Sequence, residues 1–264
     1  MVNEGQVPLV SGFSNDEKWQ AIRRDIEAWY QVQVADRGQC DFQRLGDVVL
    51  HAQYVLIPSE DSLEKTDLDM VFVWYKKNGK DDTIFLYLLD SDMPDDLNQR
   101  LLARGAMLES RAHWMWCNLN DRTGHSSEPS NINVRLMQHQ GSTKQDLPVV
   151  GDAATQQPRT VWHIAALRSG TVLGSCVLNT TVDSDSGRYT IVGGLFNMKT
   201  EAEFRRQGVG LALARFACDL AIDLGLRHLY LNASRAGESV YRKVGFESMY
   251  PSWTWKLPGQ RSIS

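Results

Sequence analysis

The segment that most restricts the fold of this chain is residues 197–225, NMKTEAEFRRQGVGLALARFACDLAIDLG. A strand ends near its start, an acidic turn follows, and RRQGVG then opens a stretch whose apolar residues recur at helical spacing. Gly225 stands where a C′ glycine commonly ends a helix. The apolar face of the helix is formed by Val209, Leu213, Phe216, Leu220 and Leu224. Strands that lead into helices and out again indicate an α/β layer structure.

The start of this helix has the properties of a phosphate-binding site. A helix begins with backbone N–H groups that lack intrahelical partners and with the positive end of its macrodipole. Gly208 and Gly210 carry no Cβ, so a pyrophosphate can approach the backbone closely. Arg205 and Arg206 can add charge-assisted hydrogen bonds. The alternative interpretation is that the two glycines only ease the packing of the helix.

Hydrophobic periodicity and turn residues divide the rest of the chain into helices and strands. An apolar stripe at helical spacing, behind Ser14 or Asn15 as N-cap, predicts a helix over residues 14–34. The first half is further predicted to contain strands at 47–57, 69–75, 83–89 and 107–119 and a helix over 94–104. The second half is predicted to contain strands at 132–138, 160–167, 172–179, 188–198, 227–232 and 252–257 and helices at 208–224 and 237–244.

Length and composition favour two domains. At 264 residues the chain exceeds the ~100 to 150 residues usual for one compact domain. Its 42% hydrophobic and 23% charged residues are ordinary for a globular protein. Residues 120–130, NDRTGHSSEPS, are polar and rich in turn residues, as is typical of a linker. We therefore expect an α/β domain over residues 1–125 and a second domain over residues 131–264.

A weak internal repeat connects the two halves. LLARGAMLESRAHWMWCNL and YRKVGFESMYPSWTWKL both run helix, glycine, strand and Trp-x-Trp. One residue must be gapped to align them, so the match is either a duplication or chance. The shared residues are Gly105 with Trp114 and Trp116, and Gly245 with Trp253 and Trp255. We expect the tryptophan pairs to bury a domain interface, because their apolar surface is large; the alternative is the wall of a binding pocket.

Two motifs of the second half resemble those of a known family. Arg205-x-x-Gly208-x-Gly210 resembles the acetyl-CoA signature R/Q-x-x-G-x-G/A of the GNAT superfamily, between the fourth strand and third helix of that fold. Residues 234–247, SRAGESVYRKVGFE, look like the second GNAT signature, a short helix with tyrosine followed by glycine and phenylalanine. The resemblance covers residues 131–257. It implies a GNAT-type α/β (α+β) fold, with a mixed, mostly antiparallel sheet and flanking helices, and makes the first half a candidate for a degenerate copy.

The resemblance also assigns residues to a site for acetyl-CoA, the implied co-substrate. In the family the fourth and fifth strands splay apart, and the pantetheine arm pairs with the exposed backbone of the fourth strand. By position this edge is Phe196, Asn197 and Met198. Asn232 ends the fifth strand, where the family often places asparagine, and Ser234 follows it. The phosphate loop corresponds to Arg205, Arg206, Gln207, Gly208, Val209, Gly210 and Leu211.

In enzymes of this type the acceptor amine attacks the thioester directly, and a tyrosine protonates the departing thiolate. Tyr241 matches that tyrosine, and a phenol suits the role because its pKa of ~10 keeps it protonated at neutral pH. The alternative is a ring that only packs against the cofactor. For the base that takes the proton from the amine, the candidates are Glu201 and Glu203, in the turn before the phosphate loop. Asp185, His163 and a chain of water molecules are alternatives.

The sequence departs from the family pattern between the first and second strands of the second half. The family places two helices there, but residues 141–160, GSTKQDLPVVGDAATQQPRT, have no helical period. Another element must cover that face of the sheet, and the helix of residues 14–34 is the available candidate. The first half lacks R-x-x-G-x-G, so we expect it to build the acceptor pocket and not to bind the cofactor.

We therefore expect an acetyl-CoA-dependent N-acetyltransferase that acts on the amine of a small molecule. The alternatives are a protein or peptide N-acetyltransferase and a non-catalytic acyl-CoA-binding module. A formal net charge of −4 and a pI near 5.9 argue against nucleic acid as a partner. No leader pattern and no apolar run near ~20 residues are present, so we expect a cytoplasmic protein without membrane contact. Four cysteines without CxxC spacing predict no metal site. The sequence predicts neither the amine nor the oligomeric state.

Overall fold

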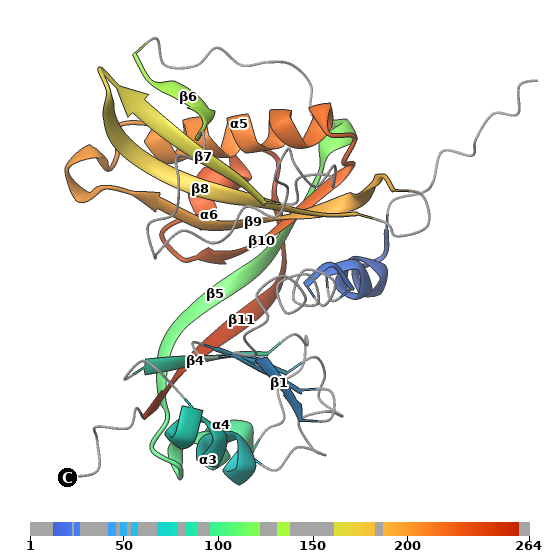
Figure 1. Cartoon of the computed structure of the whole chain (residues 1–264), viewed down its shortest axis with the longest axis vertical. Coiled ribbons are helices and arrows are strands. Elements are labelled where there is room, and N and C mark those ends of the chain that lie inside the picture. Colours follow the sequence, from blue (N-terminus) through green and yellow to red (C-terminus); the bar gives the residue numbers. More distant parts are fainter. Residues whose placement is uncertain are drawn as a thin grey trace, which may run out of the picture.

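The computed structural model describes residues 13–22, 24–26, 42–45, 48–51, 54–57, 68–78, 83–88, 96–121, 131–137, 161–182 and 187–258. Their strands form one continuous, mostly antiparallel sheet of eleven strands with helices on its faces (Figure 1). The expected fold class is confirmed. Within the described ranges, every helix is too short or too polar to serve as a membrane span.

The first half begins with a helix, formed by residues 15–22 and 24–26, which we call the N-terminal helix. Ser14 caps it as expected: its backbone N–H donates to Glu17 Oε2 at 2.7 Å, and the Glu17 N–H donates to Ser14 Oγ at 3.3 Å. The elements that follow are β1 (Phe42–Leu45), β2 (Val48–His51), β3 (Tyr54–Ile57), α3 (Leu68–Asn78), β4 (Thr83–Leu88), α4 (Leu97–Leu102), β5 (Met107–Asn118) and the 3-10 turn η1 (Leu119–Asp121).

The second half contains the strands and helices that the sequence predicts, although its last strand begins earlier than expected. Its elements are β6 (Asn133–Leu136), β7 (Val161–Arg168), β8 (Thr171–Val182), β9 (Tyr189–Thr200), the 3-10 turn η2 (Ala202–Phe204), α5 (Val209–Asp223), β10 (His228–Ser234), α6 (Glu238–Arg242) and β11 (Glu247–Pro258).

The strand order, β1-β2-β3-β4-β11-β5-β10-β9-β8-β7-β6, is nearly symmetric about its centre. On each side lies one parallel pair, β3 with β4 and β9 with β10, and a helix, α3 or α5, connects the strands of each pair. At the centre β5 pairs with β10 and β11, and β11 also pairs with β4. Figure 1 shows β5 and β11 running from one lobe into the other. The halves therefore share strands, and the division into domains 1–125 and 131–264 stays a prediction.

The internal repeat has a structural counterpart where α4 leads into β5 and α6 into β11. The Ala106 N–H donates to the Leu101 carbonyl at 3.0 Å, and the Phe246 N–H donates to the Tyr241 carbonyl at 3.1 Å. At both places the preceding residue is a glycine with positive φ. Leu101 thus occupies in the first half the position that Tyr241 occupies in the second.

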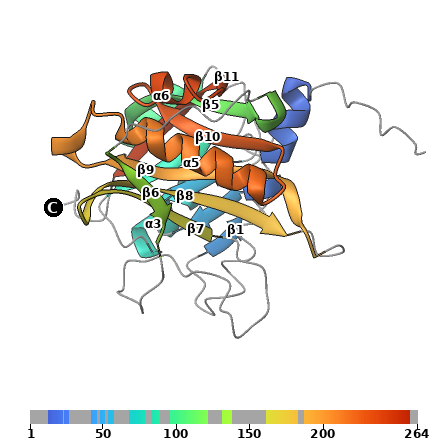
Figure 2. The ribbon, with the colours of Figure 1, turned by 90° about the horizontal axis from the view of Figure 1, so that it is seen from above.

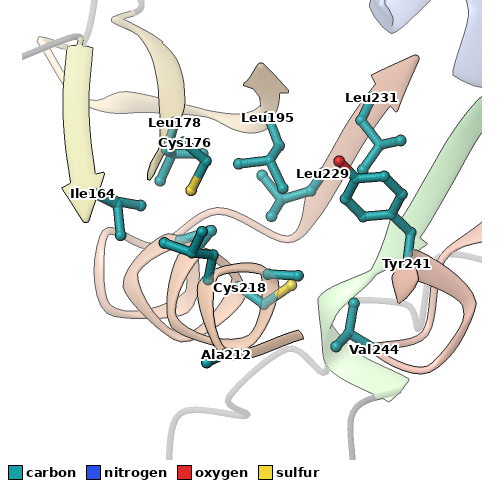
Figure 3. Packing of buried hydrophobic residues seen from close by; sticks show 14 of the residues in the cluster. Ile164, Cys176, Leu178, Leu195, Ala212, Cys218, Leu229, Leu231, Tyr241 and Val244 are labelled. Atoms are coloured by element: carbon teal, nitrogen blue, oxygen red, sulfur yellow. The ribbon is translucent and has the colours of Figure 1, made fainter. Parts of the chain in front are cut away.

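The main hydrophobic core lies between the sheet and α5, which crosses the strands in Figure 2. Ala212 and Cys218 of α5 belong to one buried cluster with Leu178 of β8 and Leu195 of β9 (Figure 3). This burial follows from the helical spacing of the apolar residues of α5. The cluster holds the buried Cys117, Cys176 and Cys218. Cys40 lies outside the described residues.

The opposite face of the sheet is covered by the N-terminal helix. A second buried cluster joins Trp19, Ile22 and Ile26 of this helix with Trp114, Trp116, Val192 and Tyr230 of the sheet. The Trp19 and Trp114 rings meet edge to face, with centroids 5.5 Å apart. This confirms that the helix covers the face and that Trp114 and Trp116 pack where the two halves meet. Trp255 is also buried, whereas the side chain of Trp253 and residues 141–160 lie outside the described parts.

The predicted strand at 69–75, DMVFVWY, is wrong, because these residues belong to α3. Leu68 and Val71 are buried whereas Val73 is 59% exposed, which is helical and not alternating burial. Asp69 accepts a hydrogen bond from Arg104 Nε at 2.7 Å. The run is rich in β-branched and aromatic residues and short, and such runs do not distinguish a strand from a buried helix.

The single strand predicted at 47–57 is also wrong in part. It is two antiparallel strands, β2 and β3, in which Val49 pairs with Leu56 and Leu50 with Val55. Within VVLHAQYVLI only His51 and Gln53 interrupt the apolar residues, so periodicity alone does not divide this run into two strands. Strand β1, which pairs with β2, was not predicted from the sequence.

Candidate functional site

The two central parallel strands of the second half separate after a short stretch of pairing. β9 and β10 pair at Val192 with His228, at Gly193 with Leu229 and at Gly194 with Tyr230, and β9 then continues to Thr200. β10 stays with β5 instead, up to the pair of Ser234 with Ala112. We call the opening beyond the Gly194–Tyr230 pair the fork. It matches the splayed strands that the resemblance implies.

Residues 196–198, predicted to form the exposed edge, lie on the β9 arm of the fork. Asn197 is exposed and has a φ of +51°, and the β8–β9 register shifts there between the Val177–Phe196 and Ser175–Lys199 pairs. This bulge turns Met198 toward the core on the α5 side, while Phe196 packs on the side of the N-terminal helix.

The predicted phosphate loop lies between β9 and α5. Gly208 is the N-cap of α5 with a φ of +86°, and its carbonyl accepts from the Ala212 N–H at 3.0 Å. Arg206 also has a positive φ, of 60°. The Gln207 side chain ties the loop down, because it accepts from Arg168 Nη1 at 3.2 Å and donates to the Glu203 carbonyl at 3.0 Å. The loop is therefore shaped before any ligand binds.

The other loop residues differ in what they offer. Arg205 and Arg206 are exposed, and Arg205 Nε donates to the Thr200 carbonyl at 3.4 Å. Val209 is buried in the core, so only its backbone can take part in binding. Gly210 is the second residue of α5, and Leu211, the third, packs partly against the core. The first turn of a helix offers backbone N–H groups to an anion.

Tyr241 is buried on α6, with its ring edge-on to Phe246 at a centroid distance of 5.8 Å. In Figure 3 its hydroxyl points from α6 toward Leu229 and Leu231 of β10, one of the two strands of the fork. Burial, together with the nearby Cys176 thiol, raises the pKa of Tyr241 to about 12. Its phenol therefore stays protonated throughout the neutral range, as a proton donor must.

The candidate bases Glu201 and Glu203 lie in the loop and not in the core. Glu201 Oε1 forms an ion pair with Lys199 Nζ at 2.8 Å, and the Glu201 backbone N–H donates to the Leu173 carbonyl at 3.0 Å. Glu203 lies exposed on η2. Of the alternatives, Asp185 lies outside the described residues, and His163 pairs with Val177 in the β7–β8 ladder.

Asn232 and Ser234 take part in contacts within the protein. Asn232 Nδ2 donates to Ser252 Oγ at 2.7 Å, which links β10 to β11 on the side of the N-terminal helix. Ser234 Oγ accepts from the Gly237 N–H at 3.3 Å and so supports the turn that leads into α6. Both residues lie on the β10 arm of the fork, because β10 continues past Asn232, its predicted end, to Ser234.

Asp25 of the N-terminal helix was not predicted as a functional residue from the sequence. Its side chain is only 5% exposed, and it accepts hydrogen bonds from Tyr230 Oη at 2.7 Å and Thr181 Oγ1 at 2.8 Å. Burial raises its pKa from 3.8 to about 6, although both hydrogen bonds act in the opposite direction. A signal was present: Asp25 stands three residues after Ile22, inside the apolar stripe of the helix.

In the parts of the chain that the structure describes, no three His, Cys, Asp or Glu side chains form a group that could hold a metal ion. What the described elements bring together is a strand fork, a helix start beside it and a buried, protonated phenol.

Comparison with known proteins agrees with this architecture. The family model described as "Acetyltransferase (GNAT) family" matches residues 131–246. A GCN5-related N-acetyltransferase from Kribbella flavida is similar in structure, with a TM-score of 0.59 and 16% identity over 90% of this chain and 95% of that chain. A GCN5-related N-acetyltransferase-like protein from Streptococcus suis has a TM-score of 0.51 and 14% identity over 92% and 100% of the two chains.

A third similar structure is a glucosamine N-acetyltransferase region in a fungal multi-domain GH3 beta-N-acetylglucosaminidase. It has a TM-score of 0.51 and 14% identity over 94% of this chain and 38% of that chain. A search of the curated proteins found no match. The similar structures extend over both halves of this chain, so they share the fold of the whole molecule.

Proposed function

Residues 131–246 form a domain of the GNAT acetyltransferase family, and from this premise we propose that the chain transfers the acetyl group of acetyl-CoA to an amine of a small molecule. The observation that carries the proposal is the fork beside the N-terminus of α5. It combines a stretch of β9 that runs on beyond its last pair with β10, which suits the amide-containing pantetheine arm, with a helix start that suits the pyrophosphate.

The proposed binding mode uses backbone more than side chains. The arm pairs with the edge of Phe196, Asn197 and Met198, and the phosphates lie against the loop of residues 205–211 with the exposed Arg205 and Arg206 beside them. The positive φ of Gly208 lets the loop turn into α5 without strain. Asn232 and Ser234 line the other arm of the fork.

In the proposed reaction the amine nitrogen attacks the thioester carbonyl, the bond from that carbon to sulfur breaks, and CoA departs as a thiolate. Tyr241 donates its phenolic proton to that sulfur. The nitrogen loses a proton in turn, to Glu201, Glu203 or water, so that the products are the N-acetyl amine and free CoA thiol. Glu203 is exposed and Glu201 is half-buried, so both carboxylates can be reached from the solvent.

A small acceptor is favoured by what covers the sheet on the acceptor side. There the N-terminal helix packs closely through Trp19 and Ile22 on Trp114 and Tyr230. An extended peptide needs an open groove along the sheet, and this helix occupies that face. We therefore propose that the first half lends the acceptor site its wall and that a small amine enters between the two halves.

The proposal is tested by isothermal titration with acetyl-CoA. A Cβ at Gly210 would lie 3.8 Å from Thr200 Oγ1 and from Val240 Cγ1, so a small side chain fits there but an indole fills the helix start. Gly210→Trp should abolish binding. Ile222→Trp places the same indole at an exposed position near the other end of α5 and should bind like wild type. If the folded wild type does not bind acetyl-CoA, the proposal is wrong.

Turnover is then followed by the release of free thiol in the presence of candidate amines. Glucosamine belongs in this screen because one structure of the same fold is described as a glucosamine N-acetyltransferase region. Acetylation of peptides but not of free amines would favour a protein N-acetyltransferase instead. Binding without turnover of any amine or peptide would favour an acyl-CoA-binding module.

A further inference from the structure

Asp25 joins the N-terminal helix to three strands of the sheet through one buried chain of hydrogen bonds. Its Oδ2 lies 2.7 Å from Tyr230 Oη of β10, and its Oδ1 lies 2.8 Å from Thr181 Oγ1 of β8. Thr181 Oγ1 lies 2.8 Å from Thr190 Oγ1 of β9, which in turn lies 2.9 Å from the Val192 carbonyl. On the otherwise apolar inner face of the helix, each oxygen of this carboxyl group thus has a hydrogen-bond partner.

The number of protons in this chain indicates the state of Asp25. There are four oxygen–oxygen contacts, and the hydroxyls of Tyr230, Thr181 and Thr190 bring three hydrogens. With an ionised Asp25 one of the four contacts has no hydrogen. With a protonated Asp25 the carboxyl donates to Thr181, Thr181 donates to Thr190, Thr190 donates to the Val192 carbonyl, and every contact is a hydrogen bond.

The described part of the chain gives Asp25 no partner of opposite charge. Among the described residues, no Lys, Arg or His forms an ion pair with it, and Arg24 on the same helix is exposed and donates to the Gln20 carbonyl. From β8 and β9 the facing groups are threonine hydroxyls, which do not titrate. From β10 they are Tyr230 and His228, and burial lowers the pKa of His228 to about 4, so it is neutral.

Tyr230 stands at the point where the fork opens. It is the last residue of β10 that pairs with β9, opposite Gly194. Its ring meets the Phe196 ring edge to face, with centroids 5.8 Å apart, and a Cβ at Gly194 would lie only 2.9 Å from Tyr230 Cζ. Phe196 precedes the bulge at Asn197. The hydroxyl that Asp25 holds therefore belongs to the ring that supports the β9 edge.

We propose that Asp25 is a positioning residue of the transfer site: its protonated carboxyl ties the N-terminal helix to Tyr230 and thereby fixes the Tyr230–Phe196 ring pair beside the edge of β9. The proposal rests on the proposed function, because it takes this edge as the place where acetyl-CoA binds. Ionisation of Asp25 strengthens its hydrogen bond with Tyr230 but leaves one contact of the chain without a hydrogen and places an uncompensated charge under the N-terminal helix. The cost of this buried charge favours release of the helix from the sheet.

The first test compares thermal unfolding of the whole chain between pH 5 and pH 8. Asp25→Asn keeps the shape of the carboxyl and, like the protonated form, accepts from Tyr230 and donates to Thr181. We expect its Tm to exceed that of wild type by a margin that grows by about 5 °C between pH 5 and pH 8. Asp16→Asn, at an exposed position of the same helix, should follow wild type at each pH. An Asp25→Asn protein that is less stable than wild type at pH 8 would overturn the proposal.

The second test is the Kd for acetyl-CoA of the same proteins over the same pH range. The phosphates of acetyl-CoA titrate in the same way for every variant. The informative quantity is therefore the ratio of two Kd values at the same pH. The Kd of wild type relative to Asp25→Asn should be near one at pH 5 and rise to about fivefold at pH 8, the lower end of usual coupling between sites. Tyr230→Phe keeps the ring but drops the hydroxyl, so it should bind with the same weakened Kd at both pH values.

The two tests separate the possible failures. If wild type does not bind acetyl-CoA, the proposed function fails. The unfolding data still test whether protonated Asp25 holds the N-terminal helix on the sheet. If the unfolding data agree but the Kd ratio stays at one throughout, Asp25 only holds the helix in place and the positioning role is wrong.

Discussion

The packing at the fork predicts a large effect of one added methyl group at Gly194. A Cβ built there would collide with the Phe196 ring and would lie 2.9 Å from Tyr230 Cζ. Both rings are packed in the cluster under the N-terminal helix, so neither can move without disturbing its neighbours. Overpacking of this kind costs ~1–3 kcal/mol, which lowers the Tm of a chain of this size by roughly 3 to 8 °C.

Gly210→Ala is the matched control, because it adds the same methyl group where there is room. Its Cβ would lie 3.8 Å from both Thr200 Oγ1 and Val240 Cγ1, which is ordinary contact. Gly210 is helical, and alanine in a helix is favoured over glycine by ~0.5–1 kcal/mol, less near an end. Differential scanning calorimetry should therefore show opposite shifts of Tm for the two variants. A Gly194→Ala protein as stable as Gly210→Ala would refute the ring packing described at the fork.

Three further predictions concern single side chains. Tyr241→Phe should lower kcat by ~10²-fold or more with an unchanged Kd for acetyl-CoA. If product release is shown not to limit turnover and kcat stays within about twofold of wild type, Tyr241 is not the acid. Trp19→Ala should lower the free energy of unfolding, measured in urea, by ~3–5 kcal/mol. The control Gln20→Ala, at an exposed residue of the same helix, should change it by no more than ~0.5 kcal/mol. Equal effects of the two substitutions would contradict the packing described for the helix. Because the pKa of Asp25 is raised from 3.8 to about 6, protonated Asp25 contributes ~3 kcal/mol to the free energy of unfolding. This contribution is present below about pH 4 and is lost as pH rises through about 6. Wild type whose stability, relative to Asp25→Asn, does not fall between pH 5 and pH 8 would contradict this.

The second half could be predicted from the sequence because its signals are local. α5 has an apolar face at helical spacing, a glycine N-cap and Gly225 at its end, and its observed range, Val209–Asp223, follows these signals closely. The motif with Arg205, Gly208 and Gly210 placed the loop beside a fork, and the structure has that fork after Gly194.

Predictions failed where a contact with a residue far along the chain determines the local structure. Residues 69–75 have the composition of a strand, yet α3 forms because Leu68 and Val71 find a buried site and Asp69 finds Arg104. Asp25 was missed for a similar reason: a carboxylate in an apolar stripe looks unfavourable until Tyr230 and Thr181 are placed beside it.

The pairing of β5 with β10 and β11 at the centre of the sheet was likewise not predictable from local sequence pattern. Because of this pairing, the expected division at residues 126–130 would separate neighbouring strands of one sheet. β10 pairs with β5 from the His228–Asn118 pair to the Ser234–Ala112 pair, so the second half draws its neighbouring strand from the first. A fragment that begins at residue 131 would leave β10 and β11 with unpaired edges at the centre of the sheet, and an unpaired central strand exposes both backbone and apolar side chains. It would also lose the N-terminal helix that covers Tyr230. In the first half Leu101 stands at the position of Tyr241, and this half supplies β5 to the centre of the sheet and the N-terminal helix to the face that carries Tyr230.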